Sequence, residues 1–204
     1  MKTILILVLI LILNPAWKNS EHPAGYQVGD FVADFSLKNI DGKFVSLSDY
    51  KEAKGFIIAF TCNTCPFAIL YEQRIIDLHK KYSSKGYPVI AINPNDPTIQ
   101  PGDSFENMQR RAKDKNYPFP YLADVTQETT RAYGATNTPH LYILKKIDGK
   151  YKVSYIGTID NNPKEPQGAT RHYIDEAMDQ ILTGKEVKEP ETKAVGCSIK
   201  WKPA

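Results

Sequence analysis

The pattern of hydrophobic and polar positions predicts that strands and helices alternate along the chain. Residues 56–60 are all apolar, as expected of a strand that is buried on both faces. After Pro66 the apolar residues recur instead at the spacing of one helix face. The positions on that face are Tyr71, Ile75, Leu78 and Tyr82. Together the two patterns predict a central strand that leads, through a short loop, into an amphipathic helix.

The other elements are predicted from apolar runs and from the turn residues between them. Asp41-Gly42 and Asp148-Gly149 are dipeptides that favour two-residue hairpin turns. Ser104 and Thr170 are expected to cap the starts of two helices. The predicted strands cover residues 31–37, 43–47, 88–92, 141–144 and 151–156, and the predicted helices cover residues 66–85, 105–115, 127–133 and 171–182.

This alternation predicts one α/β domain with a central mixed sheet flanked by helices. Hairpins near both ends of the pattern add antiparallel strands, including an N-terminal β-hairpin extension. The expected organisation is a signal peptide or N-terminal anchor at 1–20, a linker at 21–30, the domain at 31–184 and a tail docking on the domain at 185–204.

The first residues have the composition of an export signal. A basic start at Lys2 precedes an uninterrupted apolar run over residues 4–13, which Asn14 and Pro15 end. The run matches the hydrophobic part of a secretory signal and is short for a membrane span. We therefore expect an exported, periplasmic or otherwise extracytoplasmic protein, whose N-terminal segment is either cleaved or kept as a membrane anchor.

The overall composition is that of a folded protein with a mixed-charge surface. Of the 204 residues, 42% are hydrophobic and 24% are charged, which excludes a disordered chain. The formal net charge is +3, and Lys2 and Lys18 contribute two of these charges. Because the rest of the chain is close to neutral, its charge gives no indication of a nucleic-acid partner.

The candidate chemistry lies in three cysteines, Cys62, Cys65 and Cys197. The first two form a CxxC motif between the predicted central strand and the helix, which is typical of redox proteins. Proline is favoured at the first position of a helix, so Pro66 is expected there. This places Cys65 at the N-cap and Cys62 about one turn upstream. Because the start of a helix favours a thiolate, Cys65 is expected to be the nucleophile.

Several short motifs are distributed over residues 26–202. They are VADFSL at 32–37, DGK at 41–43, the spacing from Phe60 to Cys65-Pro66, Asn95-Asp96, Asp103-Ser104, Thr138-Pro139 and VGCSIKW at 195–201. Together they resemble the thioredoxin-fold redoxins, a group that includes alkyl hydroperoxide reductase, thiol-specific antioxidant peroxiredoxins and TlpA-type proteins. The resemblance implies a thioredoxin-like fold. It also implies that Thr138 and Pro139 form a cis-proline turn that faces Cys65 and positions an extended substrate.

Two departures from the family pattern bear on the activity. Ala68 stands where thioredoxins place their second cysteine, and Cys62 stands where peroxiredoxins place Thr or Ser. Since the hydroxyl that binds peroxide is missing, we expect peroxide reduction to be slow. A thiol that resolves a mixed disulfide on Cys65 must come from Cys62 or Cys197.

These observations support three functional hypotheses. In the first, the protein is a thiol–disulfide oxidoreductase with weak peroxide reductase activity, which needs no cofactor and no metal. Its partners are then a protein thiol or disulfide, or a peroxide, together with a thiol electron donor. In the second, Cys62, Cys65, Cys197 and His140 form a soft site for Cu(I) or Zn. In the third, the cysteines are static staples of an interaction domain.

The C-terminal tail holds the third cysteine. Residues 185–193 are charged and lack a core pattern, whereas Val195, Ile199 and Trp201 are apolar. Because Trp is seldom left fully exposed, we expect residues 194–202 to dock on the domain with Trp201 as the anchor. If such docking brings Cys197 within disulfide distance of Cys65 or Cys62, the tail is part of the active site; the alternative is that it docks elsewhere and Cys197 has no role. His140 follows Pro139 and is either an auxiliary residue, which stabilises a thiolate or binds a metal, or a strand residue with a satisfied ring.

Overall fold

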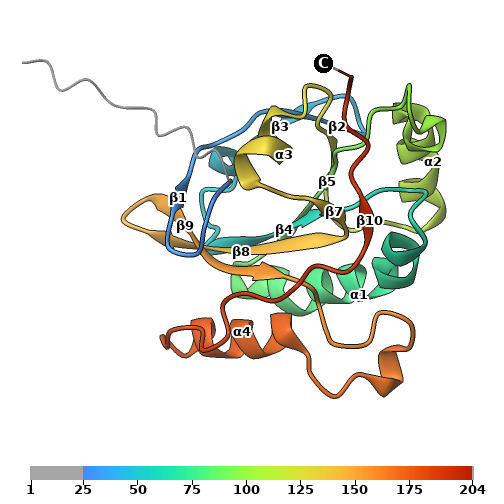
Figure 1. The fold of residues 1–204 in the computed structure, drawn as a ribbon. Coiled ribbons are helices and arrows are strands. Elements are labelled where there is room, and N and C mark those ends of the chain that lie inside the picture. Colours follow the sequence, from blue (N-terminus) through green and yellow to red (C-terminus); the bar gives the residue numbers. More distant parts are fainter. Residues whose placement is uncertain (1–24, 204) are drawn as a thin grey trace, which may run out of the picture.

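The computed structural model describes residues 25–203 of the chain. An eight-stranded sheet forms the centre of this part, and a two-stranded sheet lies beside it (Figure 1). The expected signal segment and residues 21–24 of the expected linker fall outside the described residues. Between residues 25 and 203, none of the helices has both the length and the apolar character needed to cross a membrane.

The elements alternate as the hydrophobic pattern predicts. The strands are β1 (Phe31–Val32), β2 (Leu37–Asn39), β3 (Phe44–Val45), β4 (Gly55–Phe60), β5 (Val89–Asn93), β6 (Tyr121–Ala123), β7 (Asn137–Thr138), β8 (His140–Ile147), β9 (Lys150–Gly157) and β10 (Cys197–Ser198). The helices are α1 (Pro66–Tyr82), α2 (Phe105–Asp114), α3 (Glu128–Tyr133) and α4 (Tyr173–Leu182), and short 3-10 turns are η1 (Leu47–Asp49), η2 (Ser83–Lys85), η3 (Pro101–Asp103) and η4 (Pro166–Gly168).

The large sheet is mixed, which confirms the predicted fold class. Its strand order is β1-β9-β8-β4-β5-β6-β2-β3. The central strands β4, β5 and β6 run parallel to one another, and β8 pairs antiparallel with β4. Parallel strands need a crossover, and α1 and α2 lie on the connections between them.

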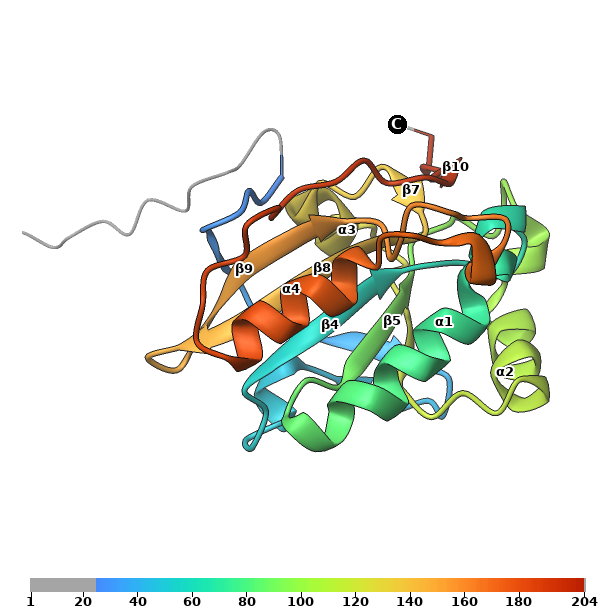
Figure 2. The ribbon, with the colours of Figure 1, turned by 90° about the horizontal axis from the view of Figure 1, so that it is seen from below.

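Strand β4 is the boundary between two cores. Ile57 and Ala59 pack with residues of α1 and α4, whereas Phe56, Ile58 and Phe60 pack on the other side with Tyr133 of α3. Figure 2 shows α1 and α4 next to each other on one face of the sheet, with α3 behind it. Because both faces are covered, every residue of β4 is buried, which accounts for its uninterrupted apolar sequence.

The turn and cap signals of the sequence are confirmed at several places. Helix α1 begins at Pro66 with Cys65 as its N-cap. The Ser104 hydroxyl caps α2 by accepting the Asn107 N–H. Asp148 and Gly149 have φ values of 49° and 80°, the left-handed pair that a two-residue hairpin turn between β8 and β9 requires.

The N-terminal stretch differs from its prediction as a single strand over residues 31–37. Its start forms β1 at one edge of the sheet, paired with β9, and its end forms β2 near the other edge, paired with β3 and β6. Between them the Asp34 carboxylate accepts the N–H groups of Phe35, Leu47 and Ser48. These bonds turn the chain out of the strand, so the predicted hairpin is confined to β2 and β3.

Two further predictions need correction. Helix α4 begins at Tyr173 with His172 as N-cap, because the Thr170 hydroxyl accepts the Asn161 side-chain amide instead of capping the helix. The short strands β6, β7 and β10 were not predicted, since two or three residues carry no measurable alternation.

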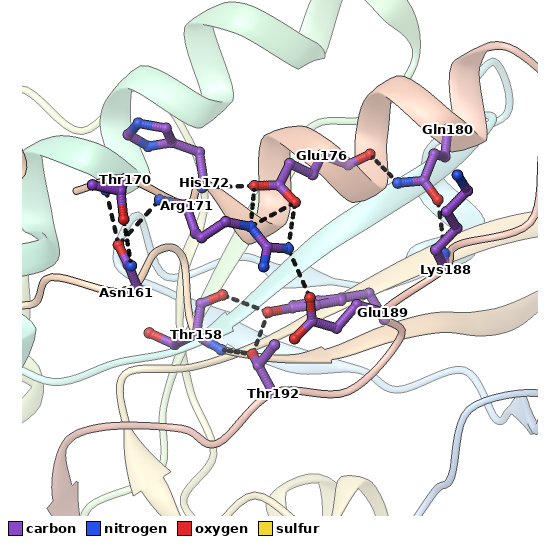
Figure 3. Close-up of polar contacts among 11 residues, drawn as sticks. Thr158, Asn161, Thr170, Arg171, His172, Glu176, Gln180, Lys188, Glu189 and Thr192 are labelled. Atoms are coloured by element: carbon purple, nitrogen blue, oxygen red, sulfur yellow. Dashed lines mark hydrogen bonds and ion pairs between the residues drawn. The ribbon is translucent and has the colours of Figure 1, made fainter.

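The charged stretch 185–193 is fixed to the domain by polar contacts (Figure 3). The Arg171 guanidinium bridges Glu176 of α4 and Glu189 of the tail, at 2.7 Å from each carboxylate. Further along, the Thr192 N–H donates to the Ile156 carbonyl, and its hydroxyl accepts the Thr158 N–H. The tail is therefore held along the end of β9 before it continues to β10, which pairs with β7 (Figure 1).

Candidate active site

The three cysteines meet at one end of the central strands. Cys62 lies two residues after the end of β4, Cys65 caps α1, and Cys197 is the first residue of β10. The peptide bond between Thr138 and Pro139 is cis and joins β7 to β8 beside them. Cys62 and Cys65 are only 3% and 4% exposed, and Cys197 is partly exposed. Of the three cysteines, Cys197 is therefore the most accessible to solvent.

Thr138 contacts all three cysteines. Its hydroxyl lies 3.1 Å from the Cys62 Sγ, and its carbonyl accepts the Cys65 thiol at 3.1 Å. Cys197 pairs with Thr138 in the register of β7 and β10, and the Cys197 N–H donates to the Cys65 Sγ at 3.3 Å. The Cys65 Sγ therefore has bonds to both Thr138 and Cys197.

Hydrogen bonds favour the ionised form of Cys65 over that of the other two thiols. The Cys62 thiol, and after it the Cys197 thiol and the N–H groups of Ala68 and Cys197, lower the pKa of Cys65 although burial opposes them. The Thr138 carbonyl also opposes them, since it can accept only from a protonated thiol. Burial and then the neighbouring Cys65 raise the pKa of Cys197.

The pKa of Cys62 is also raised. The largest cause is its hydrogen bond to Cys65, followed by burial and by the charge of Asp103. A raised pKa keeps Cys62 protonated, so that it donates to the Cys65 sulfur. The directions of the three pKa shifts therefore favour ionisation of Cys65 before Cys62 or Cys197.

A buried carboxylate holds the loop between the two cysteines. Asp103, at the end of η3, is 3% exposed and accepts the Asn63 N–H at 2.6 Å and the Thr64 hydroxyl at 3.0 Å. It also accepts the Asn95 side-chain amide at 2.7 Å. On the other side of the loop, the Tyr121 hydroxyl donates to the Asn63 side chain at 3.0 Å. The loop is therefore fixed by bonds from the connection between β5 and α2 and from strand β6.

Residues 194–202, here called the strap, lie across this site. The Lys200 N–H donates to Asn95 Oδ1 at 2.9 Å, and the Lys200 carbonyl accepts the Asp96 N–H and the Gln127 side-chain amide, each at 2.9 Å. The Ile199 side chain is 4% exposed and packs in the core on the α3 side of the sheet. Asn95 therefore connects the strap to Asp103 and so to the CxxC loop.

Trp201 and His140, the two possible auxiliary residues, have different contacts. Trp201 packs against that core and lies under the Arg131 guanidinium, 4.4 Å from its ring centre, so it contributes to the strap's attachment. His140 accepts the Thr136 N–H and contacts the Tyr142 ring in a tilted arrangement, and burial lowers its pKa to about 4. Burial thus favours the neutral imidazole, and its hydrogen bond and ring contact with described residues do not involve a cysteine.

The structure also bears on the metal hypothesis. Within residues 25–203, no group of three or more His, Cys, Asp or Glu residues is arranged to hold a metal ion.

Two residues of the site, Tyr121 and Gln127, were not predicted from the sequence. Tyr121 binds the CxxC loop, and Gln127 binds the strap. Neither residue belongs to a motif, and each reaches the site only through the tertiary fold.

Comparison with known proteins supports a redox function. The chain is 26% identical over 164 residues to the thiol-disulfide oxidoreductase ResA of Geobacillus thermodenitrificans, covering 78% of this chain and 87% of that protein. An uncharacterized conserved protein from Geobacillus kaustophilus is 39% identical, with a TM-score of 0.80 over 87% of this chain and 94% of its own.

More distant structures share the architecture. A thiol:disulfide interchange protein of the thioredoxin family from Chlorobium tepidum is 19% identical, with a TM-score of 0.57 over 78% of this chain and 99% of its own. This likeness confirms the thioredoxin-like fold. The model of the AhpC/TSA family matches residues 28–156, which include β4, the CxxC loop and the cis-proline turn. The chain therefore belongs to the AhpC/TSA family of thioredoxin-fold oxidoreductases.

Proposed function

We propose that the protein is an exported thiol–disulfide oxidoreductase in which Cys65 is the nucleophile and Cys197 the resolving cysteine. The observation that carries the proposal is the position of the Cys65 sulfur, which accepts the Cys197 N–H at 3.3 Å and has its pKa lowered by two neighbouring thiols. A thiolate is the attacking form of cysteine, and here only Cys65 is stabilised in that form.

The reaction proceeds in two exchanges. The Cys65 thiolate attacks one sulfur of a substrate disulfide, that S–S bond breaks, and the other substrate sulfur leaves as a thiolate that takes up a proton. Cys197 then loses its proton and attacks the Cys65 sulfur, which releases the first substrate sulfur. The substrate gains two electrons, and the protein is left with a Cys65–Cys197 disulfide. A thiol donor reduces this disulfide and closes the cycle.

Cys197 suits the resolving step better than Cys62. Once Cys65 is bound in a mixed disulfide it carries no charge, so its contribution to the raised pKa of both other thiols disappears. The buried Asp103 remains charged and continues to disfavour ionisation of Cys62. Cys197 is also partly exposed, so that a reductant can reach its sulfur in the disulfide.

The surroundings fit a protein substrate in an oxidising compartment. The cis bond before Pro139 presents the Thr138 backbone next to Cys65, where an extended chain can pair with it. The export signal expected at the N-terminus supports a location outside the cytoplasm, where protein disulfides persist. We propose protein thiols or disulfides as substrates and a separate thiol protein as electron donor.

The test is insulin reduction in the presence of dithiothreitol, together with a disulfide map of the oxidised protein. Cys65→Ser is expected to reduce activity to the uncatalysed background. Cys197→Ser is expected to accumulate a mixed disulfide on Cys65, whereas Cys62→Ser still forms the Cys65–Cys197 bond. Full activity of Cys65→Ser would overturn the nucleophile assignment, and a Cys62–Cys65 disulfide in the oxidised wild type would overturn the resolving role of Cys197.

A further inference from the structure

The strap closes the site in the way that a bound peptide would. Strand β10 lies antiparallel to β7, with Cys197 opposite Thr138 and Ser198 opposite Asn137. The Asn137 side-chain amide adds a bond to the Gly196 carbonyl at 2.9 Å. With this segment in place the Cys65 side chain is almost fully buried, so the disulfide of a protein cannot reach its sulfur.

The residue before Cys197 is restricted by the backbone that it faces. A Cβ atom at Gly196 would lie 2.2 Å from the Thr138 carbonyl oxygen and 3.0 Å from the Pro139 nitrogen. Both atoms belong to the main chain beside the cis bond and cannot rotate away as a flexible side chain could. Glycine is therefore needed here for close approach, and any strand in the same register meets the same restriction.

The contacts that hold the strap on the domain are few enough for it to detach. Of residues 194–202, Ile199 alone is fully buried, and Ser198 is exposed. Most of the remaining contacts are single hydrogen bonds from main-chain atoms to Asn95, Gln127 and Thr136. A substrate strand that added to β7 would replace such bonds with equivalent ones of its own, as in strand addition to an exposed sheet edge.

We propose that residues 196–198 occupy the substrate-binding position on β7. An extended cysteine-containing polypeptide then binds by displacing these residues and pairing with β7 in their place. The register then selects substrates with glycine, or the smallest possible side chain, immediately before the reactive cysteine. This inference rests on the proposed function and specifies which segment its substrates present. After the substrate cysteine has joined Cys65, the substrate strand unpairs from β7 while its cysteine stays bonded to Cys65. The strap then returns to β7, and Cys197 attacks the Cys65 sulfur as described above.

The test uses reduced full-length protein and three synthetic peptides of the form Val-Xaa-Cys-Ser-Ile-Lys, with Gly, Ala or Leu at Xaa. Each peptide cysteine carries thionitrobenzoate in a mixed disulfide. Attack by Cys65 joins its sulfur to the peptide and releases coloured thionitrobenzoate, so that the rate is read directly. The Gly peptide is expected to react about tenfold or more faster than the Leu peptide, because a leucine side chain would meet main-chain atoms that cannot move away.

The small mixed disulfide of mercaptoethanol and thionitrobenzoate serves as the reference substrate. Equal rates for the Gly and Leu peptides would overturn the proposed register. A second measurement uses Trp201→Ala, which loosens the strap, and Phe44→Ala, an exposed aromatic residue of β3, as the matched control. Trp201→Ala is expected to raise the rate of the Gly peptide relative to the reference substrate, and Phe44→Ala to leave this ratio unchanged.

A ratio that stays constant or falls in Trp201→Ala would overturn the displacement step. These results are separable from a failure of the proposed function. If Cys65 is not the nucleophile, Cys65→Ser releases thionitrobenzoate from every substrate as fast as the wild type does. If only the inference is wrong, Cys65→Ser is inactive while the wild type treats all three peptides alike.

Discussion

The CxxC loop and the strap are the two halves of one site, yet the chain holds them in different ways. The loop follows a fully buried strand, and its polar atoms are bound by the buried Asp103 and Tyr121. The strap lies on the surface and is attached largely through main-chain bonds to side chains such as Asn95 and Gln127. We therefore expect the CxxC loop to open only when the domain unfolds, whereas the strap can detach while the domain stays folded.

The largest effect is expected from removing the carboxylate that holds the loop. Asp103→Ala leaves the Asn63 N–H, the Thr64 hydroxyl and the Asn95 amide without their acceptor. Since each unsatisfied buried group costs about 1–3 kcal/mol, we expect the free energy of unfolding to fall by roughly 3 kcal/mol or more. Chemical denaturation of the reduced protein measures the change, and the exposed Asp114→Ala is the control. A loss no greater than that of the control would contradict the role assigned to Asp103.

A smaller effect is expected when the strap is weakened. Ile199→Ala removes most of the buried side chain that fixes it. We expect a loss of about 1–2 kcal/mol in global stability, below the usual range for a core Ile→Ala, because the strap releases before the domain unfolds. Hydrogen exchange should then show faster exchange at Ile199 and Lys200, while the amides of β4 keep their protection. Equal acceleration in β4 would show that the strap is part of the cooperative core.

The pH dependence of the reactivity of Cys65 tests the hydrogen bond between Cys62 and Cys65. Since the pKa of Cys65 is lowered, its alkylation by iodoacetamide should stay fast below the usual thiol range and fall only as the pH drops through that lowered value. Cys62→Ala removes the largest cause, so the midpoint of the pH profile should move upward. Cys62→Ser keeps a donor at the same place and should shift it less. An unchanged midpoint in Cys62→Ala would contradict the assignment of Cys62 as the principal donor.

The smallest effect concerns peroxide. The position that carries a hydroxyl in peroxiredoxins is occupied by Cys62, whose sulfur faces the Thr138 hydroxyl instead. We expect hydrogen peroxide to oxidise Cys65 within about one decade of the rate of a free cysteine thiolate. Stopped-flow measurement on the reduced protein checks this, with Cys65→Ser as the blank. A rate several decades higher would mean that another group activates the peroxide.

The same contrast explains how much could be predicted from the sequence. The β4–α1 junction depends on neighbouring residues, so the apolar run, the CxxC motif and Pro66 are sufficient to predict the strand, the helix start and Cys65 at the N-cap. The pairing of β10 with β7 depends on residues about sixty positions apart and on two-residue strands, which leave no periodic pattern. Trp201 and Ile199 indicated that the tail is anchored, but Gln127 gave no signal.

His140 shows a limit of a different kind. Its position directly after Pro139 left two interpretations open, a place at the thiolate and a strand residue with a satisfied ring. The residue starts β8, pairs with Phe60 in β4 and contacts the Tyr142 ring in a tilted arrangement. Adjacency in sequence to a site residue therefore does not by itself imply a shared site. The partners of Cys65 are Cys62, Thr138 and Cys197.

The anchorage of Thr192 at Gly157 has a consequence for a released strap. A Cβ at Gly157 would lie 2.1 Å from the Thr192 hydroxyl, so the two residues are in close contact and fix the tail there. Five residue steps then separate Thr192 from Cys197, and a chain of that length spans about 18 Å at most. Cys197 would remain a tethered reagent, with an effective concentration near Cys65 in the millimolar range that is typical of short linkers. A free thiol in solution would have to exceed that concentration to take over the resolving step.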